Sequence, residues 1–390
     1  MPSGVLKNLV YRAALPLRAP SPKGHMRHRT DGQPLRTPGR YERLLCRHHV
    51  LGASLLLKDG GVSCAVYTSL DGSWARQADE STLFRVASIT KMATAITVLR
   101  LCEAGRFALD DLVAPLLPSG KDLEGITLRH LLSHTSGLRD VTLSEASLRS
   151  GVPYPDVLRQ PGCREGRPGE RFCYCNFGFG LLGCVIEQAT GQPVSRAMEE
   201  LVLRPLGMRG SLDASTLEEE RIMPVTRVLT RRPAPDVRVT PLGRIPLDSP
   251  DPLRHYGHTA GALYTDAASL SVLLSMLAAG GVTESGERFL SEQTVREMTG
   301  TQAEYGRISP TLSYGLGLLI IRDPSLSGGR ILGHQGFAYG CVDGAFCEEE
   351  TGRRVVFLNG GCSEARIGRL GLCNRDLLRW AFREEMPRWK

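Results

Sequence analysis

The sequence of 390 residues contains 42% hydrophobic and 23% charged residues, a composition typical of a globular protein with a sizeable core. Its net charge of +7 comes from the N-terminal end, because residues 1–47 contain ten Lys/Arg and two Asp/Glu residues. The rest of the chain is close to neutral and has no apolar run of membrane-spanning length. Neither a nucleic-acid-binding surface nor a membrane segment is therefore expected.

Residues 1–40 are predicted to form a disordered basic extension. They are rich in arginine and in proline, which breaks helices. The segment lacks the apolar core of a signal peptide, and Met26 is an alternative to Met1 as the first residue of the protein. The folded domain is therefore expected to cover residues 41–390.

The eleven cysteines indicate reduced thiols and a cytoplasmic protein. Their number is odd, several lie in apolar runs, and a chain of this length does not need disulfides for stability. Cys173 and Cys175 are one residue apart, but no second cysteine pair completes a zinc site. No metal or other cofactor is expected.

Hydrophobic patterns predict strands near both ends of the domain and helices between them. A short helix at 41–50 is followed by strands at 51–57 and 62–70, joined by the hairpin signal Asp59-Gly60-Gly61. The later strands are expected at 314–321, 330–332, 341–348 and 353–359, before a final helix at 363–385.

The intervening helices are expected at 88–104, 127–133, 177–190, 194–203, 266–279 and 291–298. These elements predict an α/β fold, in which one sheet is built from residues 41–87 and 301–390 around a mainly helical part, 88–300. Two long irregular stretches, 139–171 and 218–258, are expected to be functional or disordered.

Ser88 and Lys91 are the first candidates for catalytic chemistry. A helix beginning near Ser88 would place them on one face, with Cβ atoms about 5–6 Å apart. A buried lysine with a lowered pKa can take the serine proton, and the N–H groups at a helix start favour developing negative charge. The same spacing also fits an N-cap serine followed by a solvated lysine, so the pair alone does not establish an enzyme.

Tyr174 and Asn176 flank Cys175, and an extended backbone would point both side chains to one side. A phenol near ammonium groups can carry protons, and an amide can orient a lysine or a substrate carbonyl. The alternative is a buried aromatic side chain in a loop.

The segment His334-Gln335-Gly336-Phe337 lies between two strand signals, and its glycine allows a ligand to approach the backbone. These four residues are candidate substrate-binding residues. The Phe337 N–H could pair with the Ser88 N–H as an oxyanion hole. The alternative is a hairpin with a surface histidine.

Three other patterns are interpreted as structural. Residues 178–183 match G-x-G-x-x-G, but no strand precedes them, so a dinucleotide site is not indicated. His130 and His134 lack the glutamate of a zinc peptidase, and His255 and His258 lie in a loop without partner residues.

Together, the three segments resemble the class C β-lactamase-related serine hydrolases, which include class C β-lactamases, DD-peptidases, D-aminopeptidases and family VIII esterases. Ser88-Ile89-Thr90-Lys91, Tyr174-Cys175-Asn176 and His334-Gln335-Gly336 occur in the order and at the approximate separations of that family. The resemblance extends over about 41–380 and includes similar stretches at 128–138, 176–191, 203–208 and 258–268.

The resemblance implies a serine β-lactamase/penicillin-binding-protein-like fold, with an antiparallel sheet flanked by helices and an inserted helical domain. Ser88 would be the acylated nucleophile, Lys91 its proton partner and Tyr174 the general base or acid. Asn176 would position the substrate amide, and His334 would line the opposite strand.

Two departures from the family bear on the substrate. The third motif is His-Gln-Gly where β-lactamases carry Lys-Thr-Gly, and no secretion signal precedes the domain. We therefore expect poor hydrolysis of β-lactams. Because histidine has a pKa of about 6.5, we also expect a preference for anionic substrates that grows as the pH falls towards 6.

The sequence thus predicts an intracellular serine hydrolase that forms an acyl-enzyme with a small ester, amide or short peptide, with its oligomeric state left open. The alternative is a catalytically idle homologue that serves as a scaffold or interaction protein. The chemically matched Ser/Lys/Tyr/Asn set disfavours that alternative.

Overall fold

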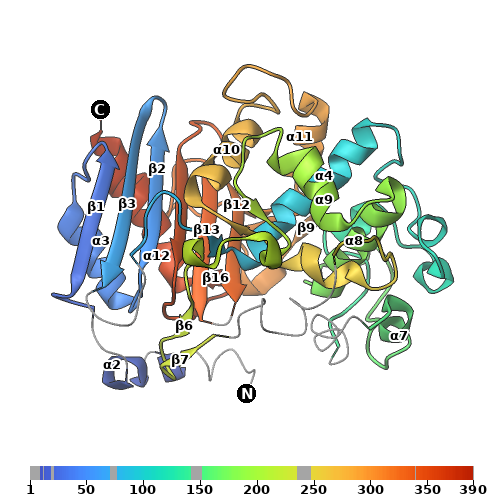
Figure 1. Cartoon of the computed structure of the whole chain (residues 1–390), viewed down its shortest axis with the longest axis horizontal. Coiled ribbons are helices and arrows are strands. Elements are labelled where there is room, and N and C mark those ends of the chain that lie inside the picture. The colour runs from blue at the N-terminus through green and yellow to red at the C-terminus, as the bar shows by residue number, and fades with distance from the viewer. Residues whose placement is uncertain are drawn as a thin grey trace.

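The computed structural model describes residues 9–11, 13–18, 22–70, 77–141, 152–234, 247–338 and 340–389. In this part of the chain, a large antiparallel sheet lies beside a group of helices, on the left and right of Figure 1 respectively. No helix within these ranges is long and apolar enough to cross a membrane.

The large sheet has nine strands in the order β1-β3-β2-β14-β13-β12-β11-β10-β9. The strands from the N-terminal part of the chain are β1 (Met26–Gly32), β2 (Ala53–Asp59) and β3 (Val62–Leu70). The strands from the C-terminal part are β9 (Ala303–Glu304), β10 (Leu312–Tyr314), β11 (Leu319–Ile321), β12 (Ile331–Ala338), β13 (Cys341–Glu348) and β14 (Arg354–Asn359). Pairing of β2 with β14 confirms that one sheet is assembled from both ends of the chain.

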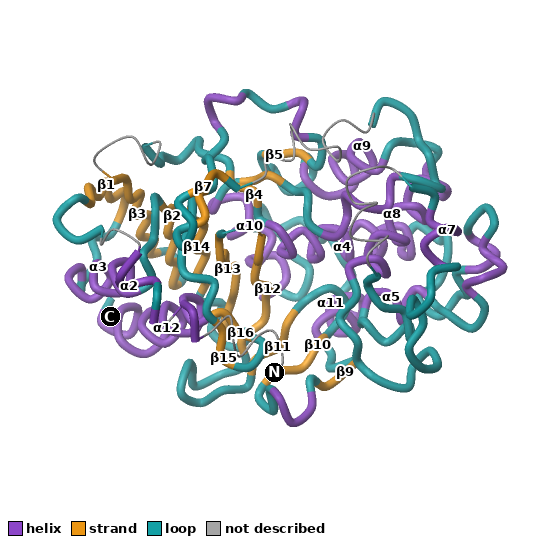
Figure 2. The backbone as a smooth tube through the Cα atoms, turned by 90° about the horizontal axis from the view of Figure 1, so that it is seen from below, coloured by secondary structure: helices purple, strands orange, loops and turns teal. Residues whose placement is uncertain are grey.

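Both faces of the sheet are covered, which explains the continuous apolar runs of its central strands. Leu55 and Leu57 share a core with residues of α3 (Pro38–Arg47) and α12 (Leu372–Trp380). Leu56 points to the opposite face and joins the core that includes α10 (Ala267–Ala278). In Figure 2, α3 and α12 accordingly lie on one side of the strands and α10 on the other.

The helical part is centred on α4 (Thr90–Glu103) and α8 (Asn176–Thr190), whose residues are mostly buried. Both helices belong to the same hydrophobic core as α10, so the helical part packs directly against the sheet. The other helices are α2 (Leu15–Arg18), α5 (Leu128–Leu132), α7 (Tyr154–Leu158), α9 (Val194–Met198) and α11 (Glu292–Thr299).

The N-terminal segment differs from the expected disordered extension. Strand β1 forms an edge of the large sheet and pairs along its whole length with β3. Further upstream, Tyr11 and Leu15 are buried in a small cluster with Val228 and Ala365. Most β1 side chains face solvent, so its pairing depends on backbone groups that composition does not reveal.

The predicted C-terminal helix is wrong over its first turns. Residues 366–371 form a hairpin of two short strands, β15 (Arg366–Ile367) and β16 (Leu370–Gly371), and the helix α12 begins at Leu372. Gly368 adopts a φ of 57°, which favours a turn over a continuing helix. Of the two irregular stretches predicted earlier, 142–151 and 235–246 lie outside the described residues.

Candidate active site

Ser88 lies in a 3₁₀ turn, Ala87–Ile89, between the short strand β4 (Phe84–Arg85) and α4. The helix begins at Thr90, two residues later than expected. Ala87 has a φ of 47°, a left-handed conformation that costs a non-glycine residue roughly 1–2 kcal/mol. The fold therefore holds the backbone immediately before Ser88 in an unfavourable conformation, as is common at functional sites.

Strand β12 runs against this turn, and Gly336 makes the close approach possible. A Cβ atom at position 336 would lie 2.3 Å from the Val86 carbonyl oxygen. Strand β11 pairs with β12 only as far as Gly333. The later residues of β12, which meet the Ser88 turn, are therefore not paired with β11. The third predicted motif is thus brought beside the first.

The Lys91 side chain is fully buried, and its amine has three oxygen neighbours. Lys91 Nζ lies 3.1 Å from Ser88 Oγ, 2.9 Å from Asn176 Oδ1 and 2.6 Å from the Ala260 carbonyl oxygen. Burial lowers the pKa of Lys91 to about 7, although the Asp140 carboxylate acts in the opposite direction.

These contacts fit a neutral amine. A neutral amine has two N–H donors and one lone pair, and the Asn176 and Ala260 oxygens can only accept. If they take the two N–H groups, the lone pair is left for the Ser88 hydroxyl proton. The geometry therefore suits removal of that proton by Lys91.

Tyr174 approaches the same hydroxyl, and its OH donates to Ser88 Oγ at 2.9 Å. Burial raises the pKa of Tyr174, while its hydrogen bond with Ser88 and the charge of Arg366 act weakly in the other direction. The phenol is therefore protonated at neutral pH and faces Ser88 as a donor. Its ring packs 4.2 Å from that of His134, whose Nδ1 accepts from the Cys175 N–H.

Asn176 is oriented by Asp140, which the sequence analysis did not single out. The Asp140 carboxylate accepts from Asn176 Nδ2 at 3.0 Å and from the N–H groups of Asn176 and Phe177 at the start of α8. Because Nδ2 is bonded to Asp140, the amide oxygen faces Lys91. A carboxylate at this helix start is also favoured by the helix dipole.

His334 lies at the site, but its ring is used inside the protein. Its Nδ1 lies 2.6 Å from the Gln335 carbonyl oxygen, and its Nε2 lies 3.0 Å from Tyr314 OH. Burial lowers the pKa of His334 to about 3, and the nearby Lys91 adds to this effect. Burial and these two internal contacts therefore disfavour the cationic form of His334 that was expected towards pH 6.

Gln335 is also committed to internal contacts. Its amide donates to the Arg369 carbonyl oxygen at 2.6 Å and accepts from the Gly371 N–H at 2.9 Å. Gln335 thus connects β12 to the β15–β16 hairpin. The neighbouring Phe337 ring lies under the Arg366 guanidinium, with 3.7 Å between the Cζ atom and the ring centroid.

A cavity of about 260 Å³ opens beside the Ser88 hydroxyl. Among the described residues that line it, none is an aspartate or a glutamate, and two are arginines. The lining residues are Ser88, Tyr174, Asn176, Tyr305, Leu319, His334, Gln335, Phe337, Arg366 and Arg369. The cavity therefore combines the three predicted motifs with a cationic wall.

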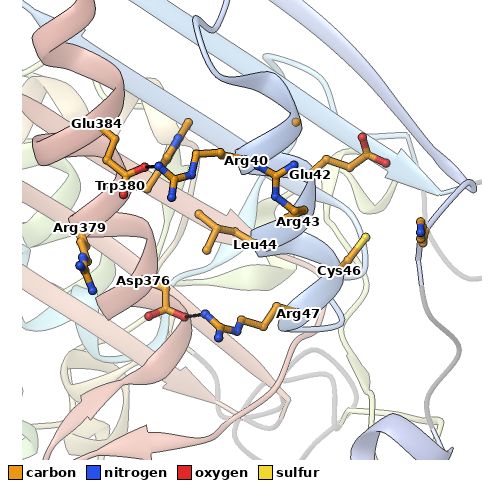
Figure 3. Close-up of a pocket in the computed structure, with 12 residues that line it drawn as sticks. Arg40, Glu42, Arg43, Leu44, Cys46, Arg47, Asp376, Arg379, Trp380 and Glu384 are labelled. Carbon is orange, nitrogen blue, oxygen red and sulfur yellow. Dashed lines mark hydrogen bonds and ion pairs between the residues drawn. The ribbon is translucent and has the colours of Figure 1, made fainter.

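A larger cleft of about 970 Å³ lies between α3 and α12 (Figure 3). Its charged side chains include the ion pairs Arg40–Glu384 and Arg47–Asp376. Its one thiol, Cys46, has a pKa raised by burial, which disfavours a nucleophilic thiolate. The cavity beside Ser88 is smaller, but the candidate catalytic residues Ser88 and Tyr174 line it.

Among the described residues, no group of three or more His, Cys, Asp or Glu side chains could hold a metal ion.

A family model described as Beta-lactamase matches residues 26–359. The chain belongs to the beta-lactamase family. Its fold is shared with solved structures. EstCE1, described as a hydrolase with promiscuous acyltransferase activity, has a TM-score of 0.68 at 21% identity, covering 89% of this chain and 97% of that one.

A second structure, the D-amino acid amidase of Ochrobactrum anthropi SV3, has a TM-score of 0.67 at 23% identity, with 86% and 94% of the two chains covered. Among curated sequences, Esterase EstB of Burkholderia gladioli is 36% identical over 36% of this chain and 40% of its own length. Penicillin-binding protein 4 of Amycolatopsis lactamdurans is 30% identical over 47% of this chain and 49% of its own length. The chain thus matches less than half the length of these curated relatives.

Several residues of this candidate site were missed by sequence reasoning. Ala260 acts through its backbone carbonyl, which has no side-chain signature. Asp140 follows the family-like stretch 128–138 by two residues, and this position was the signal that could have identified it. Arg366 and Arg369 were hidden because a helix was predicted where the hairpin forms.

Proposed function

We propose that the chain is a serine hydrolase that cleaves an ester or amide bond of a small substrate through an acyl-Ser88 intermediate. The observation that carries this proposal is the Ser88 hydroxyl, which lies 3.1 Å from Lys91 Nζ and 2.9 Å from Tyr174 OH. A serine becomes a good nucleophile when a base takes its proton. A lysine with a pKa of about 7 has a large neutral fraction at physiological pH.

In the acylation step, Ser88 Oγ attacks the substrate carbonyl carbon, and its proton moves to Lys91 Nζ. The carbonyl oxygen becomes an oxyanion, for which we assign the N–H groups of Ser88 and Phe337 as donors. As the bond to the leaving group breaks, the leaving oxygen or nitrogen takes the Tyr174 phenol proton. The proton held by Lys91 then restores the neutral phenol.

In the deacylation step, water attacks the acyl carbon and gives its proton to the Lys91–Tyr174 pair. The bond between the acyl carbon and Ser88 Oγ breaks, Oγ recovers a proton, and a carboxylic acid leaves. The same groups thus act in reverse order in the two halves of the reaction.

The relatives support both bond types, since one is named an esterase and one structural neighbour a D-amino acid amidase. The cavity volume of about 260 Å³ favours a small substrate, because pockets for drug-sized ligands usually exceed about 300 Å³. Because nitrocefin is a bulky β-lactam and the cavity is small, we still expect its turnover to be poor.

A fluorophosphonate probe tests the proposal, because it phosphonylates activated serines. We expect one adduct on the full-length protein by intact mass, mapped to Ser88 by peptide sequencing, together with turnover of 4-nitrophenyl butyrate. Ser88→Ala should lose both, whereas Ser325→Ala, a control in an exposed turn, should retain both. Labelling at another serine would refute the assignment. The absence of both labelling and turnover would also refute it, and would favour a catalytically idle scaffold.

A further inference from the structure

A second group of chemically matched side chains lies outside the Ser88 site, where the chain that follows β14 meets the start of α12. Cys362 and Cys373 are both buried in the core that includes residues of α3 and α12. Their side chains are joined by a hydrogen bond, in which the Cys362 thiol donates to the Cys373 sulfur. Neither thiol has a part in the reaction proposed for Ser88.

Backbone hydrogen bonds fix the two segments that carry these thiols. The Cys362 N–H donates to the Gly340 carbonyl oxygen at 2.8 Å, at the start of β13. The Leu372 N–H donates to the Ala365 carbonyl oxygen at 2.8 Å, which closes the β15–β16 hairpin at its base. The chain therefore leaves Cys362, forms the hairpin and returns beside Cys362 at Cys373.

His48 and Asp376 make Cys373 the more acidic thiol of the pair. The His48 carbonyl oxygen accepts from the Ser363 N–H at 2.8 Å, and His48 Nε2 lies 3.0 Å from Asp376 Oδ2. The pKa of Cys373 is lowered by the hydrogen bond from Cys362 and by the charge of His48, although burial acts in the opposite direction. Burial raises the pKa of Cys362. Cys373 is therefore the thiol that ionises first, and the thiolate is the nucleophilic form of a cysteine.

A cleft brings solvent close to this group of side chains. Asp376 lines the cleft of about 970 Å³ between α3 and α12 (Figure 3). The Asp376 side chain is 15% exposed and that of His48 only 2%, while both thiols are buried. A reagent close to water in size, such as hydrogen peroxide, is therefore better suited than a bulky one to reach the thiols during local opening of this wall.

We propose that Cys362 and Cys373 are a redox-active pair, which a peroxide converts to a disulfide and a small thiol reduces again, and that this disulfide lowers turnover at Ser88. The effect on turnover rests on the proposed hydrolase function. The formation of the disulfide does not depend on that function.

The oxidation begins when the Cys373 thiolate attacks one oxygen of the peroxide. The O–O bond breaks, the leaving oxygen takes the His48 proton, and Cys373 becomes a sulfenic acid. The Cys362 sulfur then attacks the Cys373 sulfur, the S–O bond breaks, and water leaves with the Cys362 proton. The two thiols thus lose two electrons and two protons, and the peroxide is reduced to water, or to water and an alcohol.

The disulfide acts on the Ser88 cavity through the hairpin. It closes a loop over residues 363–372, which include β15 and β16. Arg366 and Arg369 of this loop line the cavity beside Ser88. Two sulfur atoms in hydrogen-bond contact are farther apart than two bonded sulfur atoms, so forming the bond draws the ends of the loop together. The cavity wall then moves relative to Ser88.

Tryptic digestion locates the disulfide, because arginines separate the two cysteines. Cys362 lies in the fragment 355–366 and Cys373 in the fragment 370–375, and neither fragment contains a second cysteine. The full-length protein is treated with hydrogen peroxide, the remaining thiols are alkylated, and the digest is analysed by mass spectrometry without reduction. We expect the two fragments to be joined, with two hydrogen atoms lost, and dithiothreitol to separate them.

Turnover of 4-nitrophenyl butyrate is measured on the same samples. Oxidised protein should lose about threefold to tenfold in kcat/KM, because a displaced wall misplaces the substrate, and dithiothreitol should restore the activity. Cys362→Ala and Cys373→Ala each remove one sulfur atom, so neither should show this reversible loss. Cys46→Ala, at a thiol that lines the cleft, and Cys341→Ala, at a thiol near Cys362, are matched controls and should keep both the joined fragments and the loss.

The absence of joined fragments after peroxide treatment would overturn the redox pair, and so would a bond from Cys362 to Cys341 in place of Cys373. Joined fragments with unchanged turnover would overturn the effect on Ser88, as would an equal reversible loss in Cys362→Ala and Cys373→Ala. A reduced protein without any turnover would refute the hydrolase function and the effect on turnover, whereas the fragments would still decide the redox pair.

Discussion

The Lys91 amine shows how one residue gains its chemistry from its surroundings. Burial removes water from the charged form, and the Asn176 and Ala260 oxygens use the two N–H groups of the neutral form. A solvated lysine would stay protonated and could not act as a base at neutral pH. The short Ser-x-x-Lys spacing is therefore effective only inside this core.

The first prediction concerns the pH dependence of ester hydrolysis. Because the neutral amine is the active form, kcat/KM for 4-nitrophenyl butyrate should be low below the Lys91 pKa and rise through about pH 7. It should then stay level to pH 9, because burial raises the pKa of Tyr174 and keeps the phenol protonated. An acid limb near pH 4–5, as for an ordinary carboxylate, would contradict the role of Lys91.

The second prediction concerns Asp140. Its carboxylate raises the Lys91 pKa and fixes the Asn176 amide, so Asp140→Asn should move the acid limb of the pH profile to lower pH. It should also lower kcat by about tenfold to a hundredfold, because the contacts of Lys91 are disturbed. Asp156→Asn on the surface helix α7 should have neither effect. A shift to higher pH would show that Asp140 does not act on Lys91 as a charge.

The third prediction follows from the buried His334 ring. Its pKa of about 3 keeps it neutral from pH 8 to pH 6, and arginine stays charged over the same range. The ratio of kcat/KM for anionic and neutral esters should therefore be flat across this interval. A ratio that increases towards pH 6 would mean that His334 does become protonated at the site.

At the scale of elements, β12 connects the turn that contains Ser88 with the β15–β16 hairpin. Gly336 packs on the Val86 backbone, His334 bonds to Tyr314 of β10, and Gln335 bonds to the hairpin. Successive residues of this strand thus have different neighbours. The motif His-Gln-Gly is largely a set of packing contacts that define the shape of the cavity.

The fourth prediction tests this tight contact. Gly336→Ala would place a methyl group 2.3 Å from the Val86 oxygen, so β12 must move away from the Ser88 turn. We expect a loss of at least about a hundredfold in kcat/KM and about 1–3 kcal/mol in the free energy of unfolding. Gly39→Ala, in helix α3, would place its Cβ atom in ordinary contact with the Arg43 side chain at 3.6 Å, and it should be neutral or slightly stabilising. Wild-type activity in Gly336→Ala would show that the approach is not needed.

At the scale of the whole molecule, the chain ends meet the same sheet and the same cavity wall. Strand β1 adds to the edge formed by β3, and Tyr11 contacts Glu364, two residues before Arg366. The N-terminal segment is thus part of the folded body over its described residues. Its basic composition hides this, because most β1 side chains face water.

The fifth prediction is that deleting residues 1–33 lowers the free energy of unfolding by about 2–4 kcal/mol. The deletion removes the backbone pairing of β1, and this loss of stability is partly offset because fewer residues lose conformational entropy on folding. The newly exposed β3 edge should also increase aggregation on heating. A shorter deletion, 1–22, keeps β1 and should cost less. Thermal unfolding of the three proteins gives the comparison, and equal stability of all three would show that β1 contributes nothing.

The amino-acid sequence by itself determined the three candidate motifs, the two groups of strands and most helices. These features are local: Ser88 and Lys91 are close through their spacing, and short segments such as 62–70 and 341–348 have the composition of strands. The antiparallel fold followed from the resemblance to the beta-lactamase family, which the family match confirms.

Only the tertiary structure decided how these motifs are used. Ala260 reaches Lys91 through a carbonyl group, which any residue type could provide, so no pattern marks it. The hairpin at 366–371 forms because Gln335 and Ser309 bond to its backbone, and such long-range contacts outweigh the local helical pattern. The cationic wall beside Ser88 exists for the same physical reason: distant segments satisfy one another's backbone groups in the folded chain.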